Sequence, residues 1–159
     1  LVFVGNGLGA VALGWWSDRI QRRRLPMVCG ALLTITAQGV LIYTPGLSPW
    51  LLGLLALLIG IGGSSLVIAF ACGREHNVAA KVGLTIGVIN TATVGSGALF
   101  QPIIGALLDM RWSGAMLNGV PVYDADVYRF ALGILPLTSV LGLGLVAVIR
   151  ETYARPAVA

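Results

Sequence analysis

Gly14-Trp15-Trp16-Ser17-Asp18-Arg19-Ile20-Gln21-Arg22-Arg23-Arg24 is a short charged segment between two apolar runs. It holds four of the ten Lys and Arg residues of the chain. Each flanking run is long enough, or nearly so, to cross a bilayer. Short loops rich in Arg and Lys stay in the cytoplasm during membrane insertion. We therefore place this segment in the cytoplasm, and the sidedness of every later segment follows from it.

The composition points to a membrane protein. The chain has 159 residues, of which 57% are hydrophobic and 10% are charged, with a mean hydropathy of +0.93. Soluble domains carry about 25% charged residues, and a surface this apolar would be poorly soluble in water. The formal charge of +4 does not indicate a nucleic-acid partner, because the basic residues lie mainly at the ends of apolar runs, where they set topology.

Five apolar runs divide the sequence. The sequence predicts an all-α, polytopic transmembrane bundle of five spans that forms one domain over residues 1–159. The first run is slightly shorter than the roughly 20 residues that span hydrocarbon, and we expect a helix truncated at its start. In the fourth run we expect a kink at Pro102, which cannot donate to the carbonyl of Ala98. The runs cover residues 1–16, 26–44, 50–72, 82–108 and 128–149.

The distribution of positive charge fits this five-span topology. With residues 14–24 in the cytoplasm, the second charged segment (residues 73–81) and the tail after residue 149 also lie inside. Eight of the ten basic residues then lie inside and two outside, as the positive-inside rule requires. The inside residues are Arg19, Arg22, Arg23, Arg24, Arg74, Lys81, Arg150 and Arg155, and the outside residues are Arg111 and Arg129.

The first charged segment resembles the loop signature of the major facilitator superfamily, Gly-x-x-x-Asp-Arg/Lys-x-Gly-Arg/Lys-Arg/Lys. Gln21 stands where the pattern has its second Gly, which suits the weaker copy of the signature after the eighth helix. The tail Arg150-Glu151-Thr152 resembles the segment after the twelfth helix of many members. The resemblance implies helices eight to twelve, the C-terminal half of a transporter whose N-terminal half and most of helix seven are absent.

A bacterial group near the sugar-phosphate permeases shows a further similarity. The matching segments are Arg74-Glu75-His76-Asn77, Gly87-Val88-Ile89-Asn90 and Gln101-Pro102-x-x-Gly105.

The resemblance implies a conformational latch in the first charged segment. Asp18 would reach the positive N-terminus of a helix in the other half of the transporter. The alternative is that Asp18 pairs with Arg19 or Arg22 among solvated headgroups. The latch residues implied by the signature are Gly14, Asp18, Arg19, Arg22 and Arg23.

Polar residues in the fourth run predict a substrate-lining face. Asn90, Val94, Gly97 and Gln101 follow the spacing i, i+4, i+7, i+11 and share one helix face. Polar groups at membrane depth face protein or a water-filled cavity. The resemblance adds Asn6, Ser64 and Ser65 as lining candidates, whereas Thr34, Thr36 and Gln38 fall on a peripheral helix. The alternative for Asn90 and Gln101 is hydrogen bonding between helices, and Gly60 and Ser64 mark either a close helix contact or a cavity wall.

The sequence offers little for catalysis or cofactor binding. Cys29 and Cys72 are the only cysteines; we expect free thiols and no metal site. We expect His76 to be a solvated surface residue. Gly5-x-Gly7-x-Gly9 lies in an apolar run and predicts helix packing rather than a phosphate-binding loop. We expect no catalytic residue, no cofactor and no metal.

We therefore expect a secondary active transporter of a small hydrophilic solute that works by rocking two helix bundles. Its place would be the bacterial inner membrane, multi-pass, with a cytoplasmic C-terminus, and its partners would be the solute, the lipid bilayer and the N-terminal half of the same protein. The alternatives are a non-transporting membrane sensor or assembly subunit on the same fold and an integral-membrane enzyme.

Overall fold

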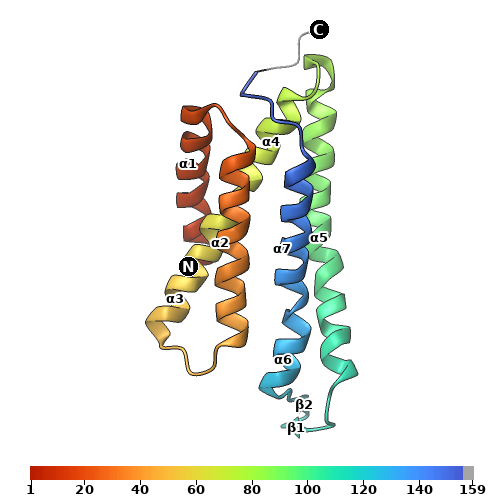
Figure 1. Cartoon of the computed structure of the whole chain (residues 1–159). Coiled ribbons are helices and arrows are strands. Elements are labelled where there is room, and N and C mark those ends of the chain that lie inside the picture. Colours follow the sequence, from red (N-terminus) through yellow and green to blue (C-terminus); the bar gives the residue numbers. More distant parts are fainter. Residues whose placement is uncertain (156–159) are drawn as a thin grey trace.

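The computed structural model describes residues 1–155, so the last four residues of the domain predicted over 1–159 lie outside the described chain. Helices follow one another along the sequence with short turns between them, and a small β-hairpin follows the longest helix (Figure 1). The elements are α1 (Val2–Ile20), α2 (Arg24–Tyr43), α3 (Pro49–Gly63), α4 (Leu66–Glu75), the 3₁₀ turn η1 (Ala79–Lys81), α5 (Val82–Met110), β1 (Met116–Leu117), β2 (Val120–Pro121), α6 (Ala125–Leu132) and α7 (Ile134–Val148).

Four helical segments of residues 1–155 are long and apolar enough to cross a membrane: Arg24–Tyr43, Pro49–Glu75, Ala79–Met110 and Ala125–Val148. They correspond to the second to fifth apolar runs, and the prediction of a helical protein with membrane-length segments is confirmed. α1 is not among the four, since its last turn carries Asp18 and Arg19. The expected first run ended near residue 16. The helix in fact continues to Ile20, and Asp18 lies in its last turn, at a helix end as expected.

Two of the membrane-length segments are interrupted helices. Between α3 and α4 the N–H of Ser65 donates to Gly62 at 3.2 Å and that of Val67 to Ser64 at 3.0 Å, which tightens the turn. Between α6 and α7 the break falls at Gly133, three residues before Pro136. Proline has no N–H to donate to the carbonyl of Leu132, so the helix is broken there. In contrast, α5 continues through Pro102 as one helix.

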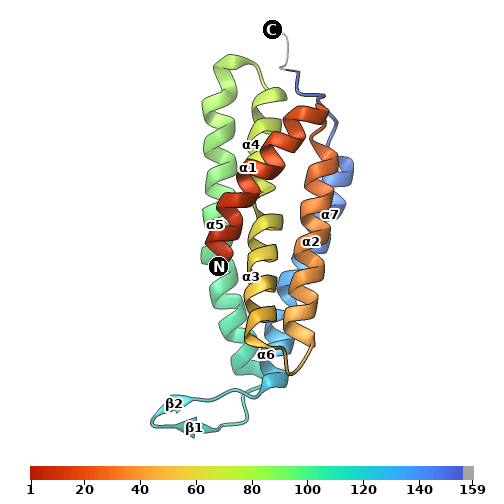
Figure 2. The same ribbon diagram turned by 90° about the vertical axis from the view of Figure 1, so that its left-hand side faces the viewer.

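Glycine residues set how closely the first helices pack. α3 lies between α1 and α2, and α2 packs against α7 on its other side (Figure 2). At Gly60 a Cβ would collide with the backbone of Val2 and Asn6, and at Gly5 it would collide with the backbone of Leu57. Only glycine permits this close approach of two helix backbones. In a lipid environment the hydrophobic effect does not drive helices together, so such close packing is what holds them in contact. The predicted packing role therefore holds for Gly5 and Gly9, whereas nothing lies within 4 Å of a Cβ built on Gly7 or Gly14.

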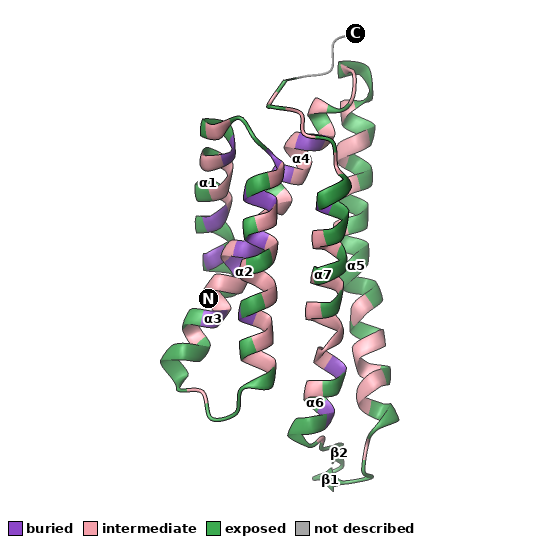
Figure 3. Cartoon of the chain, viewed as in Figure 1, coloured by how far each residue is buried: buried purple, intermediate pink, exposed green. Residues whose placement is uncertain are grey.

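Burial is uneven across the bundle. The buried residues of α1 to α4 include Met27, Ile68 and Cys72, which form a cluster with Val146 of α7. α5 has no buried residue; it touches α4 near one end and α6 near the other (Figure 3). One side of the bundle is therefore densely packed, and the longest helix stands at its edge.

Candidate functional site

Three segments that are remote in sequence meet at one end of the bundle, which we call the charged end (Figure 1). They are the α1–α2 turn, the last turn of α4, and residues 150–155 after α7. The turn between α2 and α3 and the β1–β2 hairpin lie at the opposite end, which we call the hairpin end. The chain therefore gathers the first charged segment, the second charged segment and the tail at a common end, as the alternation of five runs predicts.

Arg23 lies at the centre of the charged end. Its side chain is only 7% exposed, and its Nη2 lies 2.5 Å from Oε1 of Glu75, whose side chain is 12% exposed. Nε donates to both Glu75 oxygens at 3.1 Å, so the guanidinium binds the carboxylate with two nitrogens. The hydrogen bond with Glu75 raises the pKa of Arg23 above its usual range. A planar guanidinium suits such a carboxylate contact better than a lysine ammonium does.

The end of α1 approaches Arg23 from the other side. Nη1 of Arg23 lies 2.6 Å from Oδ1 of Asp18 and 2.9 Å from Oγ of the buried Ser17. Gln21, with φ +52°, turns the chain back by adopting the left-handed conformation. This conformation favours glycine over a residue with a side chain. Asp18 itself stays 72% exposed.

The tail after α7 joins the network through Glu151 and Thr152. The hydroxyl of Thr152 donates to Oε2 of Glu75 at 2.5 Å. The Glu151 carboxylate accepts the backbone N–H of Arg23 at 2.7 Å and that of Arg24 at 3.0 Å. Burial alone would raise the pKa of Glu151, but these backbone donors outweigh it and the pKa is lowered. Glu151 thus caps the N-terminus of α2 from more than a hundred residues away.

The residues of the implied latch divide into two groups. Gly14, Asp18 and Arg23 line one cavity of about 260 Å³ together with Glu75 and Arg74. Arg19 and Arg22 are exposed and stand outside it. The alternative that paired Asp18 with Arg19 or Arg22 names the wrong arginine, since the ion pair forms with Arg23. Whether Asp18 also reaches another half stays a prediction.

The predicted lining face of α5 is a continuous, exposed stripe. Asn90, Val94, Gly97 and Gln101 are all exposed. None of the hydrogen bonds found within residues 1–155 involves the Asn90 or Gln101 side chain, so the described chain does not show the interhelical bonding that we kept as their alternative.

The other lining candidates, Asn6, Ser64 and Ser65, lie in separate places among α1 to α4. Asn6 is exposed on α1, beside Gly60. Ser64 is 1% exposed, donates to the carbonyl of Ile61 at 2.6 Å and packs against Gly9. Of the two possibilities for Gly60 and Ser64, the structure has the close helix contact. Ser65 lines a small groove of about 240 Å³ between α2 and α7. The structure does not bring these residues into one pocket with Asn90.

The hairpin end has a different character. Tyr123 donates to Oδ1 of Asp109 at 2.6 Å, and this hydrogen bond raises the pKa of Tyr123. Arg129 pairs with Asp126, three residues away, at 2.6 Å. The guanidinium of Arg111 lies 3.7 Å from the centre of the Phe130 ring. These contacts join residues that are 3 to 19 positions apart in sequence.

Residues 1–155 include few side chains suited to redox chemistry or metal binding. Cys29 is exposed, Cys72 is buried, and both are free. His76 is exposed, and its Nδ1 lies 2.8 Å from the Cys72 carbonyl. Among residues 1–155 no three His, Cys, Asp or Glu side chains gather closely enough to hold a metal ion.

Comparison with protein-family models, curated proteins and solved structures found no match to this chain.

Five residues of the charged end were not among the predicted site residues: Glu75, Ser17, Arg24, Glu151 and Thr152. A usable signal was present for two of them. Glu75 and Glu151 each follow an arginine at the end of an apolar run, on the side already assigned to Arg23. Carboxylates and an arginine placed on one side of a membrane, at helix ends, are candidates for ion pairing. Ser17 and the backbone N–H donors give no such signal.

Proposed function

We propose that this chain belongs to a secondary active transporter of the major facilitator superfamily and supplies five helices of its C-terminal half. The cargo is a small hydrophilic solute, and the membrane is the bacterial inner membrane with the charged end in the cytoplasm. The proposal draws on the signature in residues 14–24, the membrane-length helices and the positive charge gathered at one end.

One observation carries the proposal: a membrane-length helix, α5, presents amide side chains on an exposed face. Asn90 lies about 12 Å from the start of α5 at about 1.5 Å per residue, close to the middle of a bilayer. An unpaired amide facing lipid costs several kcal/mol, so such a face turns toward water or protein. A water-filled pathway between this bundle and a second one satisfies Asn90 and Gln101 and gives a solute its route.

The charged end has a role in this proposal. Arg23 holds α1, α4 and the tail together, so these elements move as one body when the two bundles rock. Asp18, exposed on the edge of that body, is the residue placed to touch the other bundle. We expect Asp18→Asn to impair transport while leaving the amount of inserted protein unchanged.

Uptake into proteoliposomes tests the proposal. The full-length protein is reconstituted and offered a panel of labelled sugars, organic acids and sugar phosphates. A transporter accumulates one class inside the vesicles; a sensor or assembly subunit binds without net flux, and an enzyme alters the solute chemically. Either of these last outcomes rejects the proposal.

Two variants locate the pathway. Losing one hydrogen bond to the solute costs about 1.4 kcal/mol, a factor of about ten, so Asn90→Leu lowers the apparent affinity for the solute about tenfold. Thr36→Val is the matched control, since Thr36 is exposed on α2 and its hydroxyl bonds the carbonyl of Leu32 at 2.8 Å. Equal effects of the two substitutions would count against a pathway along α5.

A further inference from the structure

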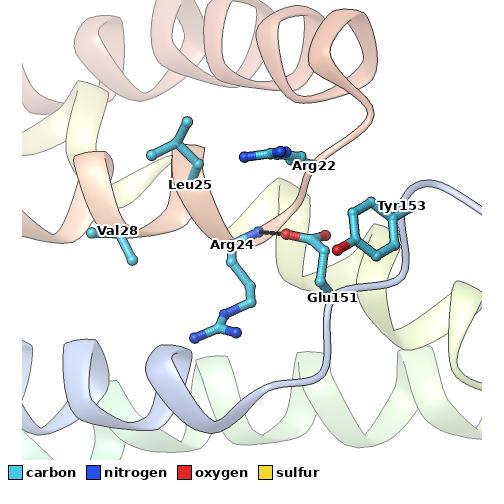
Figure 4. Close-up of a pocket in the computed structure, with 6 residues that line it drawn as sticks. All are labelled: Arg22, Arg24, Leu25, Val28, Glu151 and Tyr153. Atoms are coloured by element: carbon cyan, nitrogen blue, oxygen red, sulfur yellow. Dashed lines mark hydrogen bonds between the residues drawn. The ribbon is translucent and has the colours of Figure 1, made fainter.

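A second cavity opens beside the charged end, on the side where α2 faces the tail. It measures about 360 Å³ and is lined by Arg22, Arg24, Leu25, Val28, Glu151 and Tyr153. Figure 4 shows Arg22 and Arg24 between the tail residues Glu151 and Tyr153 on one side and the apolar residues of α2 on the other, with the two arginine side chains extending in different directions. The functional network described above uses the backbone of Arg24 but neither of these two guanidinium groups.

The charge of the cavity suits an anion. Its formal charge is +1, from two arginines and one glutamate. The Glu151 carboxylate accepts the backbone N–H groups of Arg23 and Arg24 at the N-terminus of α2. Its oxygens are therefore occupied by these donors and not by the Arg22 or Arg24 guanidinium. In the described part of the chain no carboxylate lies within ion-pair distance of Arg22 or of the Arg24 side chain.

Arg24 is already held in position. Its Nη2 donates to the carbonyl of Ala147 at 2.6 Å, which fixes the guanidinium between α2 and α7. A guanidinium has five N–H donors, so the remaining donors can still bind an oxygen ligand. Since less side-chain freedom is lost on binding, a fixed arginine makes a better anion ligand than a free one.

The wall of the cavity becomes apolar in the direction of the membrane-length part of α2. Leu25, 44% exposed, and Val28 follow Arg24 along the helix, and Val28 lies about 6 Å further along at 1.5 Å per residue. Tyr153 closes the polar side and is 55% exposed. The two arginines match the charged headgroup of a phospholipid, and the exposed apolar wall matches its acyl chain. A free inorganic anion would contact the arginines but not the apolar wall.

We propose that this cavity binds the phosphodiester headgroup of an anionic phospholipid. Arg22 and Arg24 contact the phosphate oxygens, the Tyr153 hydroxyl donates to the headgroup, and the first part of an acyl chain lies along Leu25 and Val28. Basic pockets between helices at the cytoplasmic face of a membrane suit such headgroups. The lipid contacts the α1–α2 turn, α2 and the tail together and so holds the tail against the bundle.

Lipid retention in native mass spectrometry tests this assignment. The full-length protein in mild detergent is incubated with phosphatidylglycerol or with zwitterionic phosphatidylcholine. We expect wild-type protein to keep phosphatidylglycerol in preference to phosphatidylcholine. Arg22→Gln should bind phosphatidylglycerol about tenfold more weakly, because one charge-assisted contact is lost. Arg22→Gln is the deciding variant, since no hydrogen bond within residues 1–155 uses the Arg22 guanidinium and the substitution breaks none of them.

The matched control is Arg19→Gln, which removes an equal charge from the last turn of α1, close in sequence to Arg22 but outside the cavity. Its phosphatidylglycerol retention should equal that of wild type. Equal losses in the two variants would overturn the site, because only general attraction would then be at work. Equal retention of phosphatidylcholine, or displacement of the lipid by millimolar inorganic phosphate, would also overturn it. The readout is lipid retention, so a failed transport assay does not decide it.

Discussion

The two ends of the bundle contain similar chemical groups in different arrangements. At the charged end, Arg23 joins carboxylates that lie 5 and 52 residues away, and Glu151 reaches back 128 residues to the same turn. At the hairpin end, the widest step among the side-chain contacts described above is the 19 residues from Arg111 to Phe130, followed by the 14 residues from Tyr123 to Asp109. Arg23 is 7% exposed, whereas the Arg129–Asp126 pair is 34% and 88% exposed.

This difference teaches which charges matter to the fold. A buried arginine that loses its carboxylate leaves an uncompensated charge out of water, whereas an exposed pair is already solvated. The charged end therefore ties three distant segments into one unit, and the hairpin end closes a local loop. The following substitutions test that contrast, from the largest expected effect to the smallest.

The largest effect should come from Glu75→Gln. It leaves Arg23 buried with only Asp18 as a charged partner, and we expect the free energy of unfolding to fall by about 3 kcal/mol. Asp126→Asn removes a carboxylate from an ion pair at the hairpin end and should cost at most about 1 kcal/mol. Denaturant unfolding in detergent, followed by circular dichroism, measures both. Equal costs would remove the distinction between the ends.

A smaller, pH-dependent effect should come from Glu151→Gln. Losing the charged cap of α2 should cost about 1 kcal/mol near pH 7. The pKa of Glu151 is lowered in the folded protein, so its contribution is present above the usual value of about 4.3 and is lost as pH falls through the folded pKa. Unfolding curves of wild type and variant should therefore converge at low pH. A constant gap across the whole pH range would show that the capping charge is not the cause.

Two residues in the left-handed conformation, one at each end, offer a matched pair. Gln21 has φ +52° and Asn118 has φ +51°. Left-handed backbone costs most L-residues about 1–2 kcal/mol, whereas Asn tolerates it. Glycine relieves this strain but loses more conformational entropy on folding, which cancels part of the gain. Gln21→Gly should therefore raise the free energy of unfolding by about 0.5 kcal/mol, and Asn118→Gly should leave it unchanged. Destabilisation by Gln21→Gly would mean that the Gln21 side chain makes a contact worth more than the backbone strain.

The smallest effect is spectroscopic. Because Tyr123 donates to Asp109, its pKa is raised, and the phenol should ionise above the usual value of about 10. The stabilisation from this contact is present below that pH and is lost as the phenol ionises. The difference in phenolate absorbance between wild type and Tyr123→Phe isolates this titration, and Asp109→Asn should return it to the usual range. An unchanged midpoint in Asp109→Asn would contradict the contact.

The sequence predicted much of the fold because the membrane constrains it strongly. Long apolar runs form the helices, and the charged segments at their ends form the turns between them. The interruption at Ser64–Ser65 was not predicted, because small residues alone do not distinguish a tight contact from a broken helix. The end of the first run was placed too early, near residue 16, because apolar residues stop there. The helix continues to Ile20, and the carbonyls of Asp18 and Ser17 accept the N–H groups of Gln21 and Arg22.

The candidate site was harder to predict. Asp18 and Arg23 were singled out through the signature, but the other two partners of Arg23, Glu75 and Glu151, lie 52 and 128 residues away from it. Such pairings depend on how helices are arranged in space, which a periodicity argument does not give. The face of α5 from Asn90 to Gln101 was predictable because one helix carries all of it.

The account depends most directly on the two ends lying on opposite sides of a membrane, with the charged end in the cytoplasm. Single cysteines at Gln21 and Asn118, in a background lacking Cys29 and Cys72, report each end to a membrane-impermeant maleimide. We predict that in intact cells Asn118→Cys is labelled and Gln21→Cys is labelled only after the membrane is permeabilised. Labelling of both positions in intact cells, or of Gln21→Cys alone, would contradict the account.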